Sequence, residues 1–130
     1  MIVLDASALL EVLLQTPASR AIENRIFAAG ETLHAPHLID LEIAQVLRRY
    51  VHAGEAHPDR ARQALTDLCD LPIMRYPHDL FLSRIWDLRS SITAYDAAYI
   101  ALAEELPAPL VTRDRRLATS PGHSATIEVL

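Results

Sequence analysis

Apolar residues along the chain follow two alternating patterns, short unbroken runs and stripes spaced three or four positions apart. A short run bounded by turn or cap residues predicts a buried strand, and a stripe predicts a helix with one buried face. The runs predict strands at 2–4, 33–35, 71–76, 110–112 and 126–130. The stripes predict helices at about 8–14, 17–30, 37–52, 58–68, 80–88 and 95–106, with a short helical turn at 114–117.

The predicted strands and helices alternate, which is typical of an α/β fold with a central, mostly parallel β-sheet flanked by α-helices. The length of 130 residues suits a single domain, 1–130, with its own core. The alanine-rich helix at 95–106 is apolar on nearly every side, so we expect it to be buried. We expect Ser7 to cap the first helix.

Composition narrows the class of protein. Hydrophobic residues make up 51% of the chain and the mean hydropathy is +0.13, which excludes disorder and suggests additional apolar surface for a partner. The net charge of −5 argues against a broad basic surface for nucleic acid. However, all 12 basic residues are arginine, whose planar guanidinium suits phosphate.

The single cysteine, Cys69, allows no internal disulfide, so a reducing cytoplasm is the expected location. We expect Cys69 to be a buried structural thiol, because its neighbours are apolar. The apolar N-terminus lacks a basic region and contains Asp5 and Glu11, so we interpret it as folded structure rather than a signal sequence. No uncharged apolar stretch is long enough to predict a membrane span.

Four carboxylates lie in or beside apolar segments: Asp5, Glu42, Asp96 and Asp114. Asp5 and Asp114 follow predicted strands, and sites in open α/β sheets lie beyond the carboxyl ends of strands. A buried cluster of acids repels itself, and a hard cation such as Mg²⁺ or Mn²⁺ is the usual remedy. Structural explanations also exist, since Asp5 and Asp114 could cap helices and Asp96 fits a capping box with Thr93.

Two acids of the helix at 37–52 could belong to this set. Asp40 and Glu42 flank the apolar stripe of the helix at 37–52 on opposite sides, and periodicity does not choose between them. Asp40 lies in the first turn, where an acid complements the helix dipole.

At these residues the chain resembles the PIN-domain nucleases, and within them the VapC-type toxins of VapBC toxin–antitoxin pairs, over essentially its whole length. The resemblance rests on four segments in order: IVLDASALL with Asp5 and Ser7, APHLIDLEIAQVLRR with Glu42, ITAYDAAYIALAE with Asp96, and LVTRDRRLA with Thr112 and Asp114. No departure from the family's acidic set is apparent.

The resemblance implies a Mg²⁺- or Mn²⁺-dependent endoribonuclease that hydrolyses RNA and leaves a 3′-hydroxyl and a 5′-phosphate. Asp5 and Asp96 would be the central metal ligands, with Glu42 and Asp114 completing the site directly or through water. Ser7 and Thr112 would orient ligands or waters.

The resemblance also implies partners. They are a second copy of the chain, in a homodimer, and a small VapB-type antitoxin that covers the acidic pocket. It implies neither the RNA that is cut nor the identity of the antitoxin.

For several arginines the sequence allows both RNA contact and a purely structural role. Arg113, Arg115 and Arg116 surround Asp114 and are candidates for RNA phosphate contacts, the alternative being a solvated turn. Arg49 shares a flank with Glu42 and could either pair with an acid or reach RNA. The pair His34 and His37 does not predict zinc, because Pro36 breaks the spacing and no Cys or third His lies near.

Other classes of protein fit less well. Phospho-acceptor domains also place an aspartate after the first strand, but they use a lysine that this chain lacks. Nucleotide-binding folds need glycine-rich turns, and the three glycines, Gly30, Gly54 and Gly122, are isolated. The remaining alternative is a non-catalytic PIN-fold binding module, whose acids would engage basic residues of a protein partner.

Overall fold

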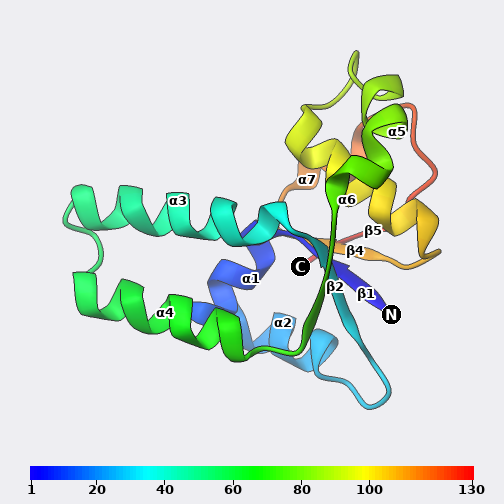
Figure 1. Cartoon of the computed structure of the whole chain (residues 1–130). Helices are drawn as coiled ribbons and strands as arrows, with labels where there is room; N and C mark the ends of the chain where they lie inside the picture. The colour runs from blue at the N-terminus through cyan, green and yellow to red at the C-terminus, as the bar shows by residue number, and fades with distance from the viewer.

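The computed structural model describes residues 1–130 and contains one five-stranded parallel sheet (Figure 1). The strands are β1 (Ile2–Leu4), β2 (Leu33–Pro36), β3 (Ile73–Tyr76), β4 (Leu110–Thr112) and β5 (Ile127–Val129). Their order in the sheet is β3-β2-β1-β4-β5, and every neighbouring pair is parallel. The predicted α/β class is therefore confirmed, and the sheet is parallel throughout.

Helices cover both faces of the sheet. Figure 1 shows α1 to α4 on one side of it and α5 to α7 on the other. Their bounds are α1 (Ala6–Leu13), α2 (Ser19–Ile26), α3 (Leu38–His52), α4 (Pro58–Asp70), α5 (Leu82–Asp87), α6 (Ala94–Glu105) and α7 (Arg115–Thr119), with a 3₁₀ turn, η1 (His78–Phe81). No helix is both long and apolar enough to cross a lipid bilayer.

The centre of the core lies where β1, β4 and α6 pack together. All three residues of β1 and of β4 are fully buried, as expected for strands covered on both faces. In α6, every residue from Ala97 to Ala103 is buried, because small alanine side chains let the helix approach the sheet closely. The predicted burial of this helix is confirmed. Its packing against the sheet places the N-terminus of α6 beside the carboxyl end of β1.

The first helix begins two residues earlier than predicted. Asp5, not Ser7, is its N-cap, because Asp5 Oδ1 accepts a hydrogen bond of 3.0 Å from the backbone N–H of Ala8. The prediction of a Ser7 cap was wrong. The Ser7 hydroxyl instead donates to Asp5 Oδ1 over 2.7 Å, so the serine supports the residue that caps the helix.

One expectation about burial also fails. Cys69 is exposed in the last turn of α4, because the inward position there is taken by Leu68, which is 2% exposed. Trp86 is 66% exposed and is therefore not part of the core. Its short helix α5 packs inward through Ile85 and the adjoining Leu88 instead.

Candidate active site

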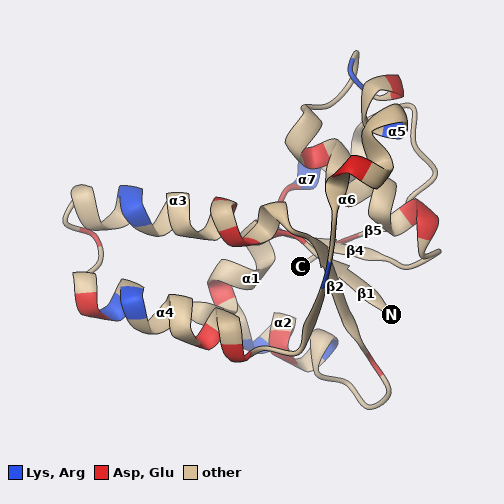
Figure 2. Cartoon of the chain, viewed as in Figure 1, with Lys and Arg blue, Asp and Glu red and all other residues tan.

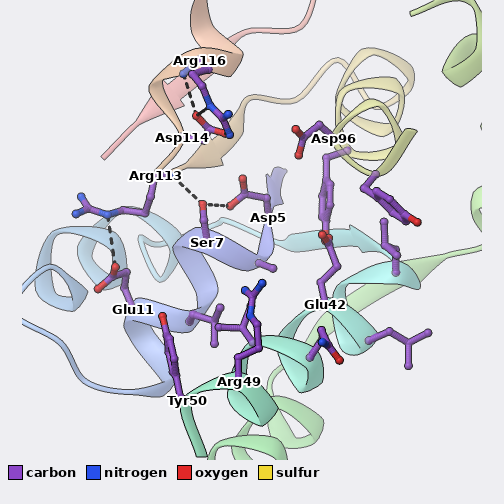
Figure 3. Close-up of a pocket in the computed structure, with 18 residues that line it drawn as sticks. Asp5, Ser7, Glu11, Glu42, Arg49, Tyr50, Asp96, Arg113, Asp114 and Arg116 are labelled. Atoms are coloured by element: carbon purple, nitrogen blue, oxygen red, sulfur yellow. Dashed lines mark hydrogen bonds and ion pairs between the residues drawn. The ribbon is translucent and has the colours of Figure 1, made fainter. Parts of the chain in front are cut away.

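A cleft of about 810 Å³ opens beside the carboxyl ends of β1 and β4. Its walls come from α1, α3, the first turns of α6 and the segment that joins β4 to α7. All four carboxylates singled out in the sequence line it: Asp5, Glu42, Asp96 and Asp114. Figure 3 shows these side chains around the same hollow, although they come from four segments that are distant in sequence.

Asp5 lies at the floor of the cleft and is 7% exposed. Besides the bonds from Ala8 and Ser7, its Oδ2 accepts a hydrogen bond from the Thr112 hydroxyl. Three donors favour the ionised carboxylate, but burial opposes it more strongly, so the pKa of Asp5 is raised above its usual value. The side chain is thus held in one orientation by β4 and α1 together.

The hydroxyls of Ser7 and Thr112 connect Asp5 to the segment after β4. Ser7 Oγ accepts the backbone N–H of Arg113 over 2.9 Å, and Thr112 Oγ1 accepts the backbone N–H of Asp114 over 3.0 Å. Each hydroxyl therefore accepts a hydrogen bond from this segment and donates one to Asp5. Thr112 is fully buried and lies beneath the cleft rather than in its lining.

Glu42 and Asp96 share the electrostatic character of Asp5. Burial is the largest influence on both carboxyl groups and raises their pKa. Neighbouring negative charges add to this effect, Asp96 and Asp5 acting on Glu42, and Asp114 acting on Asp96. Such a group of mutually repelling acids gains from any cation that enters the cleft.

Asp114 differs from the other three because it has a cation of its own. Arg116 donates to both carboxylate oxygens, with Nε 3.0 Å from Oδ1 and Nη2 2.8 Å from Oδ2. These hydrogen bonds lower the pKa of Asp114. Asp114 is also the N-cap of α7, through the backbone N–H of Arg116 at 3.0 Å.

The choice between Asp40 and Glu42 is resolved by their positions. Asp40 points away from the cleft and forms an ion pair with Arg75 of β3, with Nε 2.8 Å from Oδ2. Glu42 lines the cleft, and its Oε1 accepts a hydrogen bond of 2.5 Å from the Tyr99 hydroxyl. The first acid therefore ties α3 to the sheet, and the second belongs to the carboxylate group.

Of the three arginines around Asp114, two line the cleft. Arg113 is 3.7 Å from Glu11 through Nε and also donates to the backbone carbonyl of Leu130. Arg116 is bound to Asp114, and Arg115 is exposed outside the cleft. The basic residues of the whole chain are likewise scattered over both helical layers and form no single basic face (Figure 2).

Two residues of the site, Tyr99 and Glu11, were not predicted from the sequence. Tyr99 follows Asp96 by three positions on α6, so helix periodicity places both on one face. A buried tyrosine in an alanine-rich helix needs a partner for its hydroxyl, and that was the available signal. Nothing in the sequence indicates that Glu11 pairs with Arg113 across the cleft.

The charged donors that could hold a metal in the cleft are carboxylate oxygens, since no histidine or cysteine lines it. No three acidic, histidine or cysteine side chains are close enough together to form a ready-made metal cage. Ca²⁺ needs six to eight ligands, whereas Mg²⁺ keeps several waters and often uses only one or two protein carboxylates. The donor set therefore fits a hydrated Mg²⁺ or Mn²⁺ better than a fully protein-enclosed ion.

Comparison with known proteins places these features in a family. A family model described as "PIN domain" matches residues 2–121. The chain is 43% identical over 130 residues to "Ribonuclease VapC12" of Mycobacterium tuberculosis, covering 100% of this chain and 99% of the relative. It is 41% identical over 129 residues to "Ribonuclease VapC1" of the same species, covering 98% of this chain and 96% of the relative.

Solved structures support the same fold. A structure described as PAE2754 from Pyrobaculum aerophilum superposes with a TM-score of 0.72 at 26% identity, covering 99% of this chain and 83% of that one. VapBC2 from Rickettsia felis, bound to a DNA fragment from its promoter, also gives a TM-score of 0.72, covering 99% and 98%. At 15% identity the second likeness concerns the fold alone. Together with the family match and the full-length relatives, these findings show that the chain belongs to the PIN-domain family and is of the VapC type.

Proposed function

We propose that this protein is the toxin of a type II toxin–antitoxin pair and acts as a metal-dependent endoribonuclease. The observation that carries the proposal is the meeting of four carboxylates from four distant segments in one cleft. Relatives that cover the whole chain at 41–43% identity bear the name ribonuclease VapC, which supports RNA as the substrate.

Mg²⁺ or Mn²⁺ is the proposed cofactor, with Asp5 and Asp96 as its principal ligands. Glu42 and Asp114 would complete the site directly or through water. When bound, such an ion makes water more acidic and neutralises charge on a phosphate. The raised pKa values of Asp5, Glu42 and Asp96 support the proposal, since a divalent cation would relieve the repulsion that causes part of each shift.

The side chains around the ligands have distinct tasks in this scheme. Ser7 and Thr112 hold the Asp5 carboxylate in one orientation through their hydroxyls. Tyr99 fixes Glu42, and Arg116 fixes Asp114. Because three of the four acids are already oriented, little rearrangement of Asp5, Glu42 and Asp114 would accompany substrate binding, which is the condition for efficient electrostatic catalysis.

The proposed reaction is hydrolysis. Water attacks the phosphorus of an RNA phosphodiester, the bond from phosphorus to the 3′-oxygen breaks, and the 3′-oxygen takes up a proton. The products are a 3′-hydroxyl and a 5′-phosphate. This scheme needs no covalent nucleophile from the protein.

The proposed partners are a VapB-type antitoxin and a second copy of the chain. The antitoxin partner follows from the VapC type of the chain, which the family model and the full-length relatives support. Large apolar side chains remain exposed in the free chain, among them Leu80, Leu82 and Trp86 at 58–68%, and they leave surface for such contacts.

The experiment that tests the enzyme is cleavage of a mixed cellular RNA pool by purified, antitoxin-free protein with Mg²⁺ or Mn²⁺. We expect cutting at few sites, its loss in EDTA, and a loss of more than roughly 100-fold in Asp96→Asn, since even groups that only support a metal ligand cost 10–100-fold. The matched control is Asp70→Asn, which makes the same chemical change at an exposed position outside the cleft.

A non-catalytic binding module remains the alternative function, because an acidic cleft can also hold arginines of a protein partner. A thermal shift with Mn²⁺ separates the two proposals. We expect Mn²⁺ to raise the melting temperature of the wild type and not that of Asp5→Asn. No cleavage together with no shift by any divalent ion would favour the binding module.

A further inference from the structure

The cleft is poorly suited to RNA in one respect, which is its charge. Five of its lining residues are acidic, and only three are basic: Arg49, Arg113 and Arg116. A metal ion offsets the acids only where it binds. The phosphates on either side of the bond to be cut therefore need a cation from the protein, because RNA affinity comes largely from neutralised phosphates.

Two of the three arginines are already engaged within the chain. Arg116 is bound to both oxygens of Asp114. Arg113 faces Glu11 and donates to the carbonyl of Leu130. Either guanidinium would have to break a contact with an oxygen acceptor before it could bind a phosphate. The cost of breaking that contact reduces its net affinity for phosphate.

Arg49 is the exception. Its guanidinium makes no hydrogen bond and no ion pair within the chain, and the residue is exposed. Figure 3 shows it rising from α3 into the cleft, towards Asp5 and Ser7. All its N–H groups are thus free to donate to a ligand in the cleft, and a guanidinium can bind phosphate with two parallel hydrogen bonds.

The position of Arg49 on α3 selects which phosphate it can reach. It follows Glu42 by seven residues, two helical turns, so the two share a face and are separated by about 10 Å along the helix. The buried residues Ile43 and Leu47 hold this part of α3 against the core. The backbone of Arg49 is therefore held in place beside the four carboxylates rather than among them.

We propose that Arg49 binds a backbone phosphate of the RNA next to the one that is cut, and so sets the path of the strand through the cleft. The proposal rests on the proposed ribonuclease function. It gives Arg49 a role in binding RNA, not in the chemical step, and ranks it above Arg113, Arg115 and Arg116 as the phosphate ligand.

The test is RNA binding in the Asp96→Asn background, which prevents cleavage. The probe is a short, fluorescently labelled single-stranded RNA of mixed sequence, and its affinity is measured by anisotropy over a range of salt concentrations. Arg48→Ala is the matched control, because Arg48 is adjacent on α3, is exposed and lies outside the cleft. Arg49→Lys keeps the charge and removes the planar fork.

For Arg49→Ala we expect affinity to fall about tenfold, as for the loss of one charge-assisted phosphate contact. The plot of log affinity against log salt should become shallower by about 0.7, the value for one phosphate on a single strand. Arg49→Lys should restore the slope and only part of the affinity, and Arg48→Ala should change neither.

The proposal is overturned if Arg49→Ala keeps the parent slope, or if it loses no more affinity than Arg48→Ala. Failure of the enzyme proposal would look different, because the wild-type protein would then cut no RNA whatever residue stands at position 49. Equal melting temperatures of the two alanine variants exclude misfolding as the cause of a binding loss.

Discussion

Asp5 combines two tasks that usually fall to different residues. It caps α1, and it presents a carboxylate to the cleft. The cap and the Ser7 hydroxyl both use Oδ1, and the Thr112 hydroxyl reaches Oδ2, so Oδ2 still keeps unused acceptor capacity. The sequence suggested capping and metal binding as alternatives for this residue, and the geometry allows both.

The carboxylate of Asp96 gives a pH-dependent prediction. Its pKa is raised in the folded protein, so its ionisation weakens the fold, and the stability difference develops as pH rises above about 4. In EDTA, the wild type should therefore lose free energy of unfolding relative to Asp96→Asn between about pH 4 and pH 7. Urea unfolding at several pH values measures this difference. A difference that is constant with pH would contradict the raised pKa.

Glu42 and Asp40 give a second prediction at the residue scale. Glu42→Gln keeps an oxygen for the Tyr99 hydroxyl but removes the charge, so we expect normal stability and loss of RNA cleavage. Asp40→Asn breaks the partly exposed pair with Arg75, so we expect a loss of about 1 kcal/mol or less and unchanged cleavage. Denaturant unfolding and RNA cleavage are measured for both variants. Normal cleavage by Glu42→Gln together with loss of cleavage in Asp40→Asn would show that Asp40, and not Glu42, is the acid of the site.

At the scale of elements, periodicity predicted most helices and strands within two or three residues. The stripe of Ile39, Ile43 and Leu47 defined α3, and the run Ile2–Leu4 defined β1. Local contacts between side chains could not be predicted from periodicity. The cap of α1 depended on whether Asp5 or Ser7 faced the first turn, and the sequence offers both residue types there. Cys69 was misjudged because apolar neighbours do not fix which way one residue of a helix faces.

The junction of β1, α1 and β4 gives a prediction for an element boundary. Thr112→Val keeps the shape of the side chain, but Asp5 loses a donor and the backbone N–H of Asp114 loses its acceptor. Since the site is buried, we expect the free energy of unfolding to fall by about 1–3 kcal/mol. Cleavage should fall about 10–100-fold, as for other groups that orient metal ligands.

Thr66→Val serves as the control for this change, because Thr66 is exposed on α4 and bonds only to its own helix. If Thr112→Val unfolds and cleaves like Thr66→Val, the hydroxyl of Thr112 has no part in holding Asp5. A loss of stability alone, with normal cleavage, would assign Thr112 to the fold and not to the site.

At the scale of the whole molecule, the strand order explains where the cleft lies. The helices that follow β1 cover one face of the sheet, and the helix that follows β4 covers the other (Figure 1). Neighbouring parallel strands whose connections leave in opposite directions create a crevice at their carboxyl ends. Asp5 and Asp114 follow these two strands, so the fold itself brings them together.

The sequence predicted that Asp5 and Asp114 follow strands, but it did not give the order of those strands. The sequence also could not show which arginines form ion pairs, since the partners of Arg113 and Arg116 are set by the folded cleft. Asp5, Asp96 and Asp114 were predictable from the residues, and the family resemblance indicated Glu42 rather than Asp40, whereas the free guanidinium of Arg49 emerged only from the structure.

The chemical identity of the RNA ends that the protein produces distinguishes metal-dependent hydrolysis from attack by the RNA 2′-hydroxyl. Hydrolysis at a metal-bound carboxylate cleft predicts 5′-phosphate and 3′-hydroxyl ends on every fragment, formed with Mg²⁺ or Mn²⁺ by the wild type and not by Asp96→Asn. Fragments with 5′-hydroxyl and 2′,3′-cyclic phosphate ends would show that the RNA 2′-hydroxyl is the nucleophile. That result, or equal cleavage by Asp96→Asn, would exclude metal-dependent hydrolysis by the four carboxylates of the cleft.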